Sequence, residues 1–270
     1  MSKALINYRV ALEIKDQIAF VRLSRADKLN ALDMPMFEAI IKAAKSVSRN
    51  KEIRGVILSG EGRAFCSGLD VKSMLKNPLA ALKLLIKPGT KFSNIAQDVS
   101  YLWREVPVPV IAVTHGKCWG GGLQIALGAD FRYAQSDCTF SIMETKWGLI
   151  PDMAGSIALR ELMPIDRAKE ITMTSEVFDA KKALEYNLVT RVSDDPMREA
   201  IEFLNSIKLK SPDAISYTKK LYNSAWLSTI RQALNLETQL QRKLIGRHNQ
   251  KISGAVHAGD KSHEDYKQRS

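Results

Sequence analysis

Residues 110–124, VIAVTHGKCWGGGLQ, contain the pattern that decides the fold: a short apolar run, followed within a few residues by three consecutive glycines. An apolar run of this length is typical of a buried strand, and glycine permits positive φ angles and close approach of the backbone to other groups. The same pattern occurs earlier, where VIL at 56–58 precedes AFCSGLD at 64–70. Two such turns could direct two backbone N–H groups at one oxygen atom. That is the geometry of an oxyanion hole, which stabilises negative charge on a carbonyl oxygen.

The elements around these turns alternate between strands and helices. Val10, Leu12 and Ile14 recur at every second position, and the run IAFVRL at 18–23 follows after the polar residues KDQ at 15–17, which predicts a hairpin. Asp33 precedes apolar residues spaced i, i+3, i+4 and i+7 from Phe37, which predicts a capped amphipathic helix. We expect further strands at 55–59, 131–134, 139–142 and 188–192, and helices at 123–127 and after Asp179. This alternation predicts an α/β core.

The segment 71–105 is the least regular part of this core. It is interrupted at Asn77-Pro78 and at Lys87-Pro88-Gly89, where we expect turns. A helical stripe of apolar residues follows, from Phe92 to Trp103, and Pro107 ends it.

The C-terminal part has a helical pattern, over 197–208, 213–227 and 229–247. The last of these segments has an apolar face that needs a partner, which suggests an oligomer. We therefore expect a core of residues 1–195 and a C-terminal helical region of residues 196–270. The tail from Lys251 is polar and is expected to be mobile.

The composition is that of an ordinary globular protein, with 270 residues, 45% hydrophobic and 26% charged. A net charge of +11 fits either a polyanionic ligand or solvated lysines, and the scattered placement of the lysines favours the second, so nucleic acid is not an expected partner. No membrane-spanning stretch or secretory signal is visible, and we expect a cytoplasmic protein. Three cysteines and four histidines show no disulfide or metal-ligand spacing, and neither GxSxG nor GxGxxG occurs.

Four segments, taken in order, are similar to the crotonase (enoyl-CoA hydratase/isomerase) superfamily over about residues 9–247. They are RADKLNAL at 25–32, AFCSGLD at 64–70, GKCWGGGLQIAL with DFR at 116–132, and FSIME with GLIP at 140–151. The resemblance implies an α/β core built as a spiral of ββα turns, with C-terminal α-helices that build a homotrimer or a dimer of trimers. It implies an acyl-CoA thioester as substrate, so that coenzyme A is part of the substrate and no separate cofactor or metal is needed.

The resemblance also assigns roles to residues. The backbone N–H groups of Leu69 and Gly121 would hold the thioester oxygen, and Glu144 would be the acid/base. The residues expected to bind substrate are Arg25, Lys28, Ala31, Ser67, Gly68, Asp70, Lys72, Gly120, Trp119 and Trp147. Arg25, Lys28 and Lys72 are candidates for phosphate contacts or ordinary surface cations, and the two tryptophans either line the acyl pocket or pack against the core.

Gln124 departs from the family's hydratase pattern, because it lies where those enzymes have one of two glutamates. An amide cannot transfer a proton at neutral pH and can only hold a water or a substrate oxygen. One carboxylate suffices to move a proton along the acyl chain, and apolar Ile142 and Met143 would raise the pKa of Glu144. Asp152 resembles the second proton carrier of the dienoyl-CoA isomerase branch, or it caps a helix that begins after it.

We therefore expect an enzyme that shifts the double bond of an enoyl-CoA. The alternatives are an enoyl-CoA hydratase in which Gln124 holds water, and a non-catalytic acyl-CoA- or RNA-binding relative. A thioesterase or decarboxylase of the same superfamily would use the same oxyanion hole.

Overall fold

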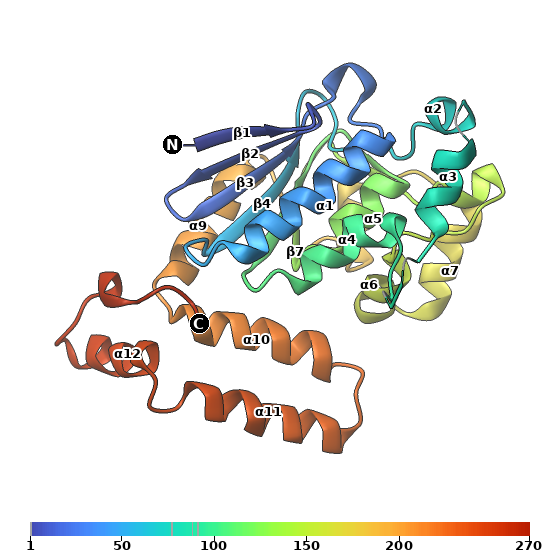
Figure 1. Ribbon diagram of the computed structural model, residues 1–270. Helices are drawn as coiled ribbons and strands as arrows, with labels where there is room; N and C mark the ends of the chain where they lie inside the picture. Colours follow the sequence, from blue (N-terminus) through green and yellow to red (C-terminus); the bar gives the residue numbers. More distant parts are fainter. Residues whose placement is uncertain (1, 77, 88, 91) are drawn as a thin grey trace.

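A seven-stranded sheet forms the centre of the computed structural model, which describes residues 2–76, 78–87, 89–90 and 92–270 (Figure 1). Its strands are β1 (Ser2–Ile6), β2 (Val10–Lys15), β3 (Ile18–Leu23), β4 (Gly55–Gly60), β5 (Val110–Thr114), β7 (Phe131–Gln135) and β10 (Arg191–Ser193). They are hydrogen-bonded in the order β1-β2-β3-β4-β5-β7-β10. The pairs β1–β2 and β2–β3 are antiparallel, and all pairs from β3 onward are parallel.

A second, three-stranded sheet lies beyond the ends of the parallel strands. It consists of β6 (Lys117–Trp119), β8 (Thr139–Ser141) and β9 (Phe178–Asp179). The backbone of Cys66 adds to this sheet by a single parallel β-bridge to Cys118 of β6, without a disulfide. After β4, β5 and β7 in turn, the chain therefore passes through this second layer before it continues. This repetition confirms the α/β spiral that the resemblance implies.

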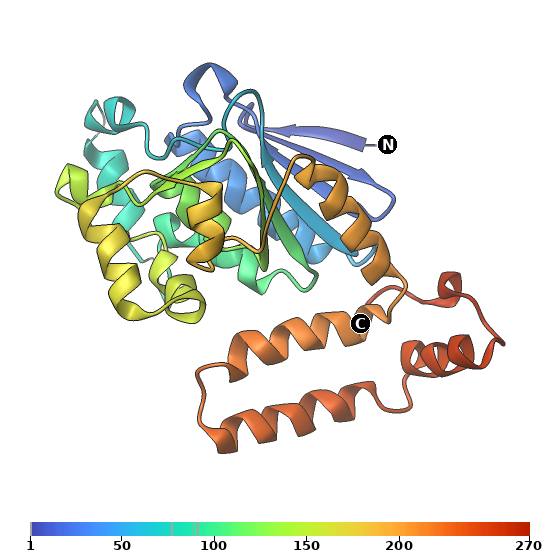
Figure 2. The same cartoon turned by 180° about the vertical axis from the view of Figure 1, so that it is seen from behind.

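Helices cover both faces of the large sheet (Figures 1 and 2). On one face, α1 (Met34–Arg49) packs on β1–β3, and α4 (Ile95–Glu105) packs against α1 and α5 (Gly121–Leu127). As expected, Asp33 caps α1 by accepting the N–H of Met36 at 3.0 Å. On the other face, α9 (Pro196–Lys208) buries Leu204 against Ile18 and Ile57. By its packing α9 belongs with the core, although the boundary expected after residue 195 groups it with the C-terminal helices.

The remaining core elements are short and surround the second sheet. They are η1 (Ala26–Lys28), α2 (Val71–Leu75), α3 (Pro78–Leu85), η2 (Glu144–Trp147), α6 (Gly155–Leu162), α7 (Ile165–Thr174) and α8 (Ala180–Glu185). Asp179 caps α8, as expected, through the N–H of Lys182. The turns expected at Asn77 and Pro88 involve residues outside those that the structure describes.

The C-terminal helices form an appendage below the core (Figure 1). Helices α10 (Pro212–Ala225) and α11 (Ile230–Leu244) make an antiparallel pair, followed by α12 (His248–Ala258) and the one-turn helix η3 (His263–Asp265). The expectation of a mobile tail from Lys251 is wrong. Arg269 is only 4% exposed, because its guanidinium donates to the carbonyls of Ser48 (2.7 Å), in the last turn of α1, and of Ile53 (2.9 Å), between α1 and β4.

Within the described residues, we find no helix whose length and apolar character would let it span a lipid bilayer.

Candidate functional site

The two glycine turns lie against each other at the ends of β4 and β5. Cys66 accepts the N–H of Trp119 and donates its own N–H to Lys117, each at 3.0 Å. Gly68 has a φ of +94°, and a Cβ there would lie 3.0 Å from the carbonyl oxygen of Trp119. Because that neighbour is backbone, only glycine allows the turns to approach so closely.

Two backbone N–H groups are available where the turns meet. The peptide that joins Gly68 to Leu69 is fixed at its oxygen, which accepts the N–H of Leu32 at 2.8 Å. A trans peptide is planar, so the Leu69 N–H points the opposite way, away from Leu32. Gly121 is the first residue of α5, where the helix provides no acceptor for its N–H. Within the described chain, neither N–H donates to a backbone carbonyl, which leaves both for a ligand oxygen.

The carboxyl group of Glu144 lies beside these donors. Glu144 is the first residue of η2, with two residues between it and the end of β8, and its Oε1 would lie 3.7 Å from a Cβ placed on Gly120. Its other oxygen, Oε2, is buried and has no hydrogen-bond partner among the described residues. Burial raises the pKa of Glu144, and the charge of Asp152 raises it further, whereas a hydrogen bond from Gln124 acts to lower it. A carboxylate of this kind is a good proton acceptor with one oxygen unoccupied.

Gln124 holds the first oxygen of that carboxyl group. Its Nε2 donates to Oε1 of Glu144 at 2.5 Å, and its own Oε1 accepts the N–H groups of Met153 (2.9 Å) and Gly155 (3.2 Å). Since only the amide oxygen can accept from two N–H groups, the backbone fixes which way the amide points. The side chain, 1% exposed, is thus occupied by the protein itself, whereas the sequence suggested that it holds a water or a substrate oxygen.

Asp152 is half-buried, and its charge acts on Glu144. Its own pKa is raised by burial. Its alternative role as a helix cap is not found, because the residue before α6 is Ala154 and no side chain caps that helix.

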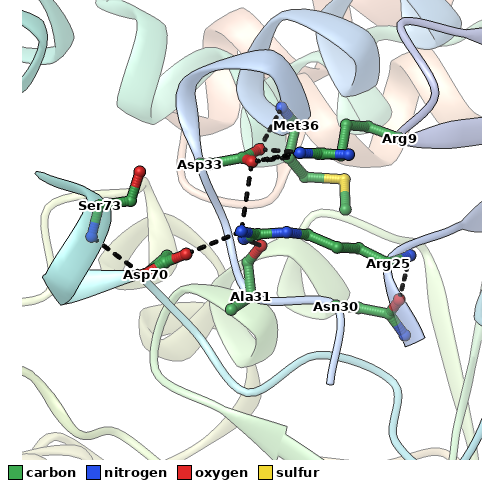
Figure 3. Close-up of polar contacts among 8 residues, drawn as sticks. All are labelled: Arg9, Arg25, Asn30, Ala31, Asp33, Met36, Asp70 and Ser73. Atoms are coloured by element: carbon green, nitrogen blue, oxygen red, sulfur yellow. Dashed lines mark hydrogen bonds and ion pairs between the residues drawn. The ribbon is translucent and has the colours of Figure 1, made fainter. Parts of the chain in front are cut away.

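A network of four charged side chains holds the segment 25–33 against the first glycine turn (Figure 3). Nη2 of Arg25 lies 2.9 Å from Oδ2 of Asp70 and 3.5 Å from Oδ2 of Asp33. Asp33 also accepts from Arg9, at 2.8 Å from its Nη2. Burial acts to raise the pKa of Asp70, but the Ser73 N–H and Arg25 outweigh it, so the pKa is lowered.

The other residues expected to bind substrate are spread around this centre. Gly68 and Gly120 form the turns, and Ser67 and Ala31 are half-buried beside them. Lys28 and Lys72 are exposed. Trp119 is half-buried and donates to Oγ1 of Thr139, whereas Trp147 is 61% exposed and does not pack into the core.

Sequence reasoning missed the residues that support the site. Asn30 is fully buried and donates through Nδ2 to the carbonyls of Glu61, Ala64 and Phe65, which fixes the start of the first turn. The backbone N–H groups of Met153 and Gly155, which orient Gln124, carry no side-chain signal. An asparagine in a short polar segment is typical of turns, and this was the one available indication. Among the described residues no cluster of acidic, histidine or cysteine side chains could hold a metal ion.

Comparison with known proteins agrees with this arrangement. The family model described as enoyl-CoA hydratase/isomerase matches residues 13–269. The chain belongs to the enoyl-CoA hydratase/isomerase family. It is 27% identical over 263 residues to the short-chain-enoyl-CoA hydratase of Clostridium acetobutylicum, covering 96% of this chain and 98% of that protein.

Other members of the family show how wide the range of activities is. The mitochondrial Delta(3,5)-Delta(2,4)-dienoyl-CoA isomerase of Rattus norvegicus is 29% identical over 216 residues, which cover 75% of this chain and 64% of that protein. The crystal structure of an enoyl-CoA hydratase from Polaromonas sp. JS666 superimposes with a TM-score of 0.82 at 28% identity, covering 94% of this chain and 98% of that chain. The family therefore contains both hydratases and isomerases.

Proposed function

We propose that this enzyme shifts the double bond of an enoyl-CoA thioester, with Glu144 as its acid/base. The observation that carries the proposal is the asymmetry of the Glu144 carboxyl group. Oε1 is held by Gln124 and lies 3.7 Å from a Cβ placed on Gly120, the residue before Gly121. Oε2 is buried and has no hydrogen-bond partner among the described residues. One carboxylate oxygen and two N–H donors supply what proton transfer next to a thioester requires.

The proposed reaction starts from a 3-enoyl-CoA. Oε2 of Glu144 removes a proton from C2. The electron pair of that C–H bond forms a double bond between C1 and C2, and the π electrons of the carbonyl move onto the thioester oxygen. The N–H groups of Leu69 and Gly121 stabilise this oxyanion. The dienolate then takes the same proton back at C4 while the carbonyl re-forms, which leaves the double bond between C2 and C3. The reaction needs no water and no second carboxylate.

The relatives support the substrate class and leave two reactions to compare. One relative, from Streptococcus mutans, is named a trans-2-decenoyl-[acyl-carrier-protein] isomerase and is 26% identical over 238 residues. The similarity to the Clostridium acetobutylicum hydratase over nearly the whole chain favours hydration as the second candidate. In that reaction one remaining N–H of the Gln124 amide would have to hold the water.

The test follows 3-enoyl-CoA, 3,5-dienoyl-CoA and crotonyl-CoA by ultraviolet absorbance. We expect isomerisation without fast hydration, and we expect Glu144→Gln to lower its kcat about 10²–10⁴-fold, since it removes the group that takes the proton from C2. Glu185→Gln, an exposed glutamate on α8, is the matched control and leaves the rate unchanged. Fast hydration of crotonyl-CoA by the unaltered enzyme would contradict the isomerase proposal.

Gln124→Glu tests the proposed division between the two reactions. One carboxylate oxygen would accept the N–H groups of Met153 and Gly155, as the amide oxygen does, and the other would face Glu144. Two carboxylates whose oxygens lie as close as Nε2 of Gln124 and Oε1 of Glu144 do now, at 2.5 Å, share a proton. We expect crotonyl-CoA hydration to increase in this variant while isomerisation at neutral pH decreases.

We further propose that the substrate is the enzyme's only coenzyme A species, with no separate cofactor, and that Asp152 carries a second proton when the substrate is a dienoyl-CoA. A cytoplasmic homotrimer or dimer of trimers, with neither a membrane nor a nucleic acid as partner, remains our prediction for the protein in the cell.

A further inference from the structure

We propose that Arg25 is a positioning residue: its guanidinium locks the first glycine turn so that the Leu69 N–H points at the substrate's carbonyl oxygen. Arg25 then has no contact with the phosphates of coenzyme A. The inference rests on the proposed function, because it names the device that keeps the oxyanion-binding group of that site in place.

The guanidinium of Arg25 is already occupied by the protein. Its Nη1 donates to the carbonyl of Ala31 at 2.9 Å, and its Nη2 lies between the carboxylates of Asp33 and Asp70 (Figure 3). The side chain is 13% exposed. A phosphate would have to displace two carboxylates that are held at close range, and a neighbouring negative charge would oppose it.

Arg25 binds the carboxylates of Asp33 and Asp70, and each of these residues directly follows a residue of one parallel β-bridge. Leu32 is bridged to Leu69, through Leu32 N–H to Gly68 at 2.8 Å and Asp70 N–H to Leu32 at 3.0 Å. Asp33 follows Leu32, and Asp70 follows Leu69. Arg25 therefore ties together the two segments one residue beyond the bridge that sets the peptide plane of Leu69.

Asp70 is fixed at every polar group on its side chain. Its Oδ1 accepts the N–H of Ser73 at 3.0 Å and so caps the N-terminus of α2. Its Oδ2 pairs with Arg25. Without Arg25, Oδ2 of Asp70 would lose its partner, and α2 could move Asp70 away from Leu32. Rotation of the peptide between Gly68 and Leu69 would follow, which turns the N–H away from the oxyanion.

The predicted consequence is a loss in kcat rather than in binding. Removing one oxyanion donor costs about 10²–10³-fold in kcat in enzymes of known mechanism. We expect Arg25→Gln to lower kcat about 10²-fold and Arg25→Lys to lower it less, because lysine restores the charge without the fork that reaches three acceptors. Arg198→Gln, which removes an exposed ion-paired arginine on α9, is the control and leaves kcat unchanged.

Enoyl-pantetheine, which lacks the phosphates and the adenosine, separates positioning from phosphate binding. If Arg25 positions the turn, Arg25→Gln lowers kcat by the same factor with enoyl-CoA and with enoyl-pantetheine. A rise in KM that is confined to enoyl-CoA would overturn the inference and show a phosphate contact. Should Arg25→Gln not fold, Asp70→Asn carries the test, since asparagine keeps the cap on Ser73 but loses the charge that faces Arg25.

A second measurement does not depend on turnover. In a Glu144→Gln background, the infrared stretch of a ¹³C-labelled thioester carbonyl reports the hydrogen bonds that its oxygen accepts. We expect a shift to lower frequency that Arg25→Gln reduces. If this shift is present but the unaltered enzyme isomerises nothing, the proposed function alone is contradicted. A shift that Arg25→Gln leaves intact, or no shift at all, would overturn the role of Arg25.

Discussion

Neighbours of Glu144 act on its pKa in opposite directions. Burial and the charge of Asp152 raise it, and the Nε2–H of Gln124 acts to lower it. A general base works only when it is ionised. A raised pKa therefore moves the loss of activity on acidification to a pH above 4.5, the ordinary value for this group.

Asp152→Asn should shift this acid limb to lower pH. Removing the negative charge removes one of the causes that raise the pKa of Glu144, so the base stays ionised further into the acid range. The measurement is kcat/KM against pH with a 3-enoyl-CoA, and Asp260→Asn, in the exposed C-terminal tail, is the control. An unmoved limb would mean that the charge of Asp152 does not reach Glu144. A selective fall in kcat with 3,5-dienoyl-CoA would support its role as second proton carrier.

At the scale of the element, the start of α5 depends on contact between two backbones. A Cβ on Gly122 would lie 2.5 Å from the carbonyl oxygen of Cys66, which cannot move without displacing the first turn. In α12, by contrast, nothing lies within 4 Å of a Cβ on Gly254. The two positions offer a matched pair of glycines in helices.

Gly122→Ala should lower the free energy of unfolding by about 3 kcal/mol, as overpacking of a filled core does. Gly254→Ala should raise it by about 0.5–1 kcal/mol, because alanine loses less backbone entropy in an open helical position. Chemical denaturation of both variants measures the difference. Equal effects would show that the turns are not in rigid contact.

The elements that local sequence predicts are those with a clear period or cap. The strands β2 to β5, the caps Asp33 and Asp179 and both glycine turns follow from residues close together in the chain. The strands β6 and β9 have three and two residues, too few to show a period. Helix α7 was not predicted, and a helix in the place of α6 appeared only as the alternative role of Asp152. The mobile tail was predicted wrongly, because the burial of Arg269 depends on carbonyls 216 and 221 residues away along the chain.

At the scale of the whole molecule, buried polar anchors join the appendage to the core. Nζ of Lys219 on α10 donates to the carbonyls of Trp103 (2.9 Å) and Val108 (3.0 Å) and lies 2.7 Å from Oδ2 of Asp130. Asp213 on the same helix accepts from Asn249 of α12 and from the backbone N–H of Ser270. These bonds hold α10 beside the sheet and α12 beside α10.

Lys219→Met should lower the free energy of unfolding by about 3–5 kcal/mol. Methionine fills a similar volume, but the carboxylate of Asp130, 17% exposed, would lose its cationic partner and keep only the N–H of Val110. Urea denaturation measures the effect, and Lys220→Met, at the exposed neighbouring position, should change stability little. A small effect at Lys219 would mean that α10 is held by its apolar contacts instead.

In the candidate site, the sequence predicts the residues that stand in local motifs but not the contacts between distant segments. Leu69, Gly121 and Glu144 stand in motifs that the sequence displays, and the structure brings them together. The amide of Gln124 contacts a carboxyl group 20 residues away, and Arg25 joins carboxylates on two separate segments. Which partner a polar side chain finds depends on the completed fold, so neither role was visible from spacing.

The segment between α2 and α4 lies in the connection from β4 to β5, and these two strands are neighbours in the sheet. Its two ends are anchored independently, by the Asp70 cap on α2 and by the Asn94 capping box on α4. Long surface insertions cost little extra closure entropy. Descendants of this chain can therefore lengthen, shorten or replace the stretch between these two caps at little cost to the sheet that it connects.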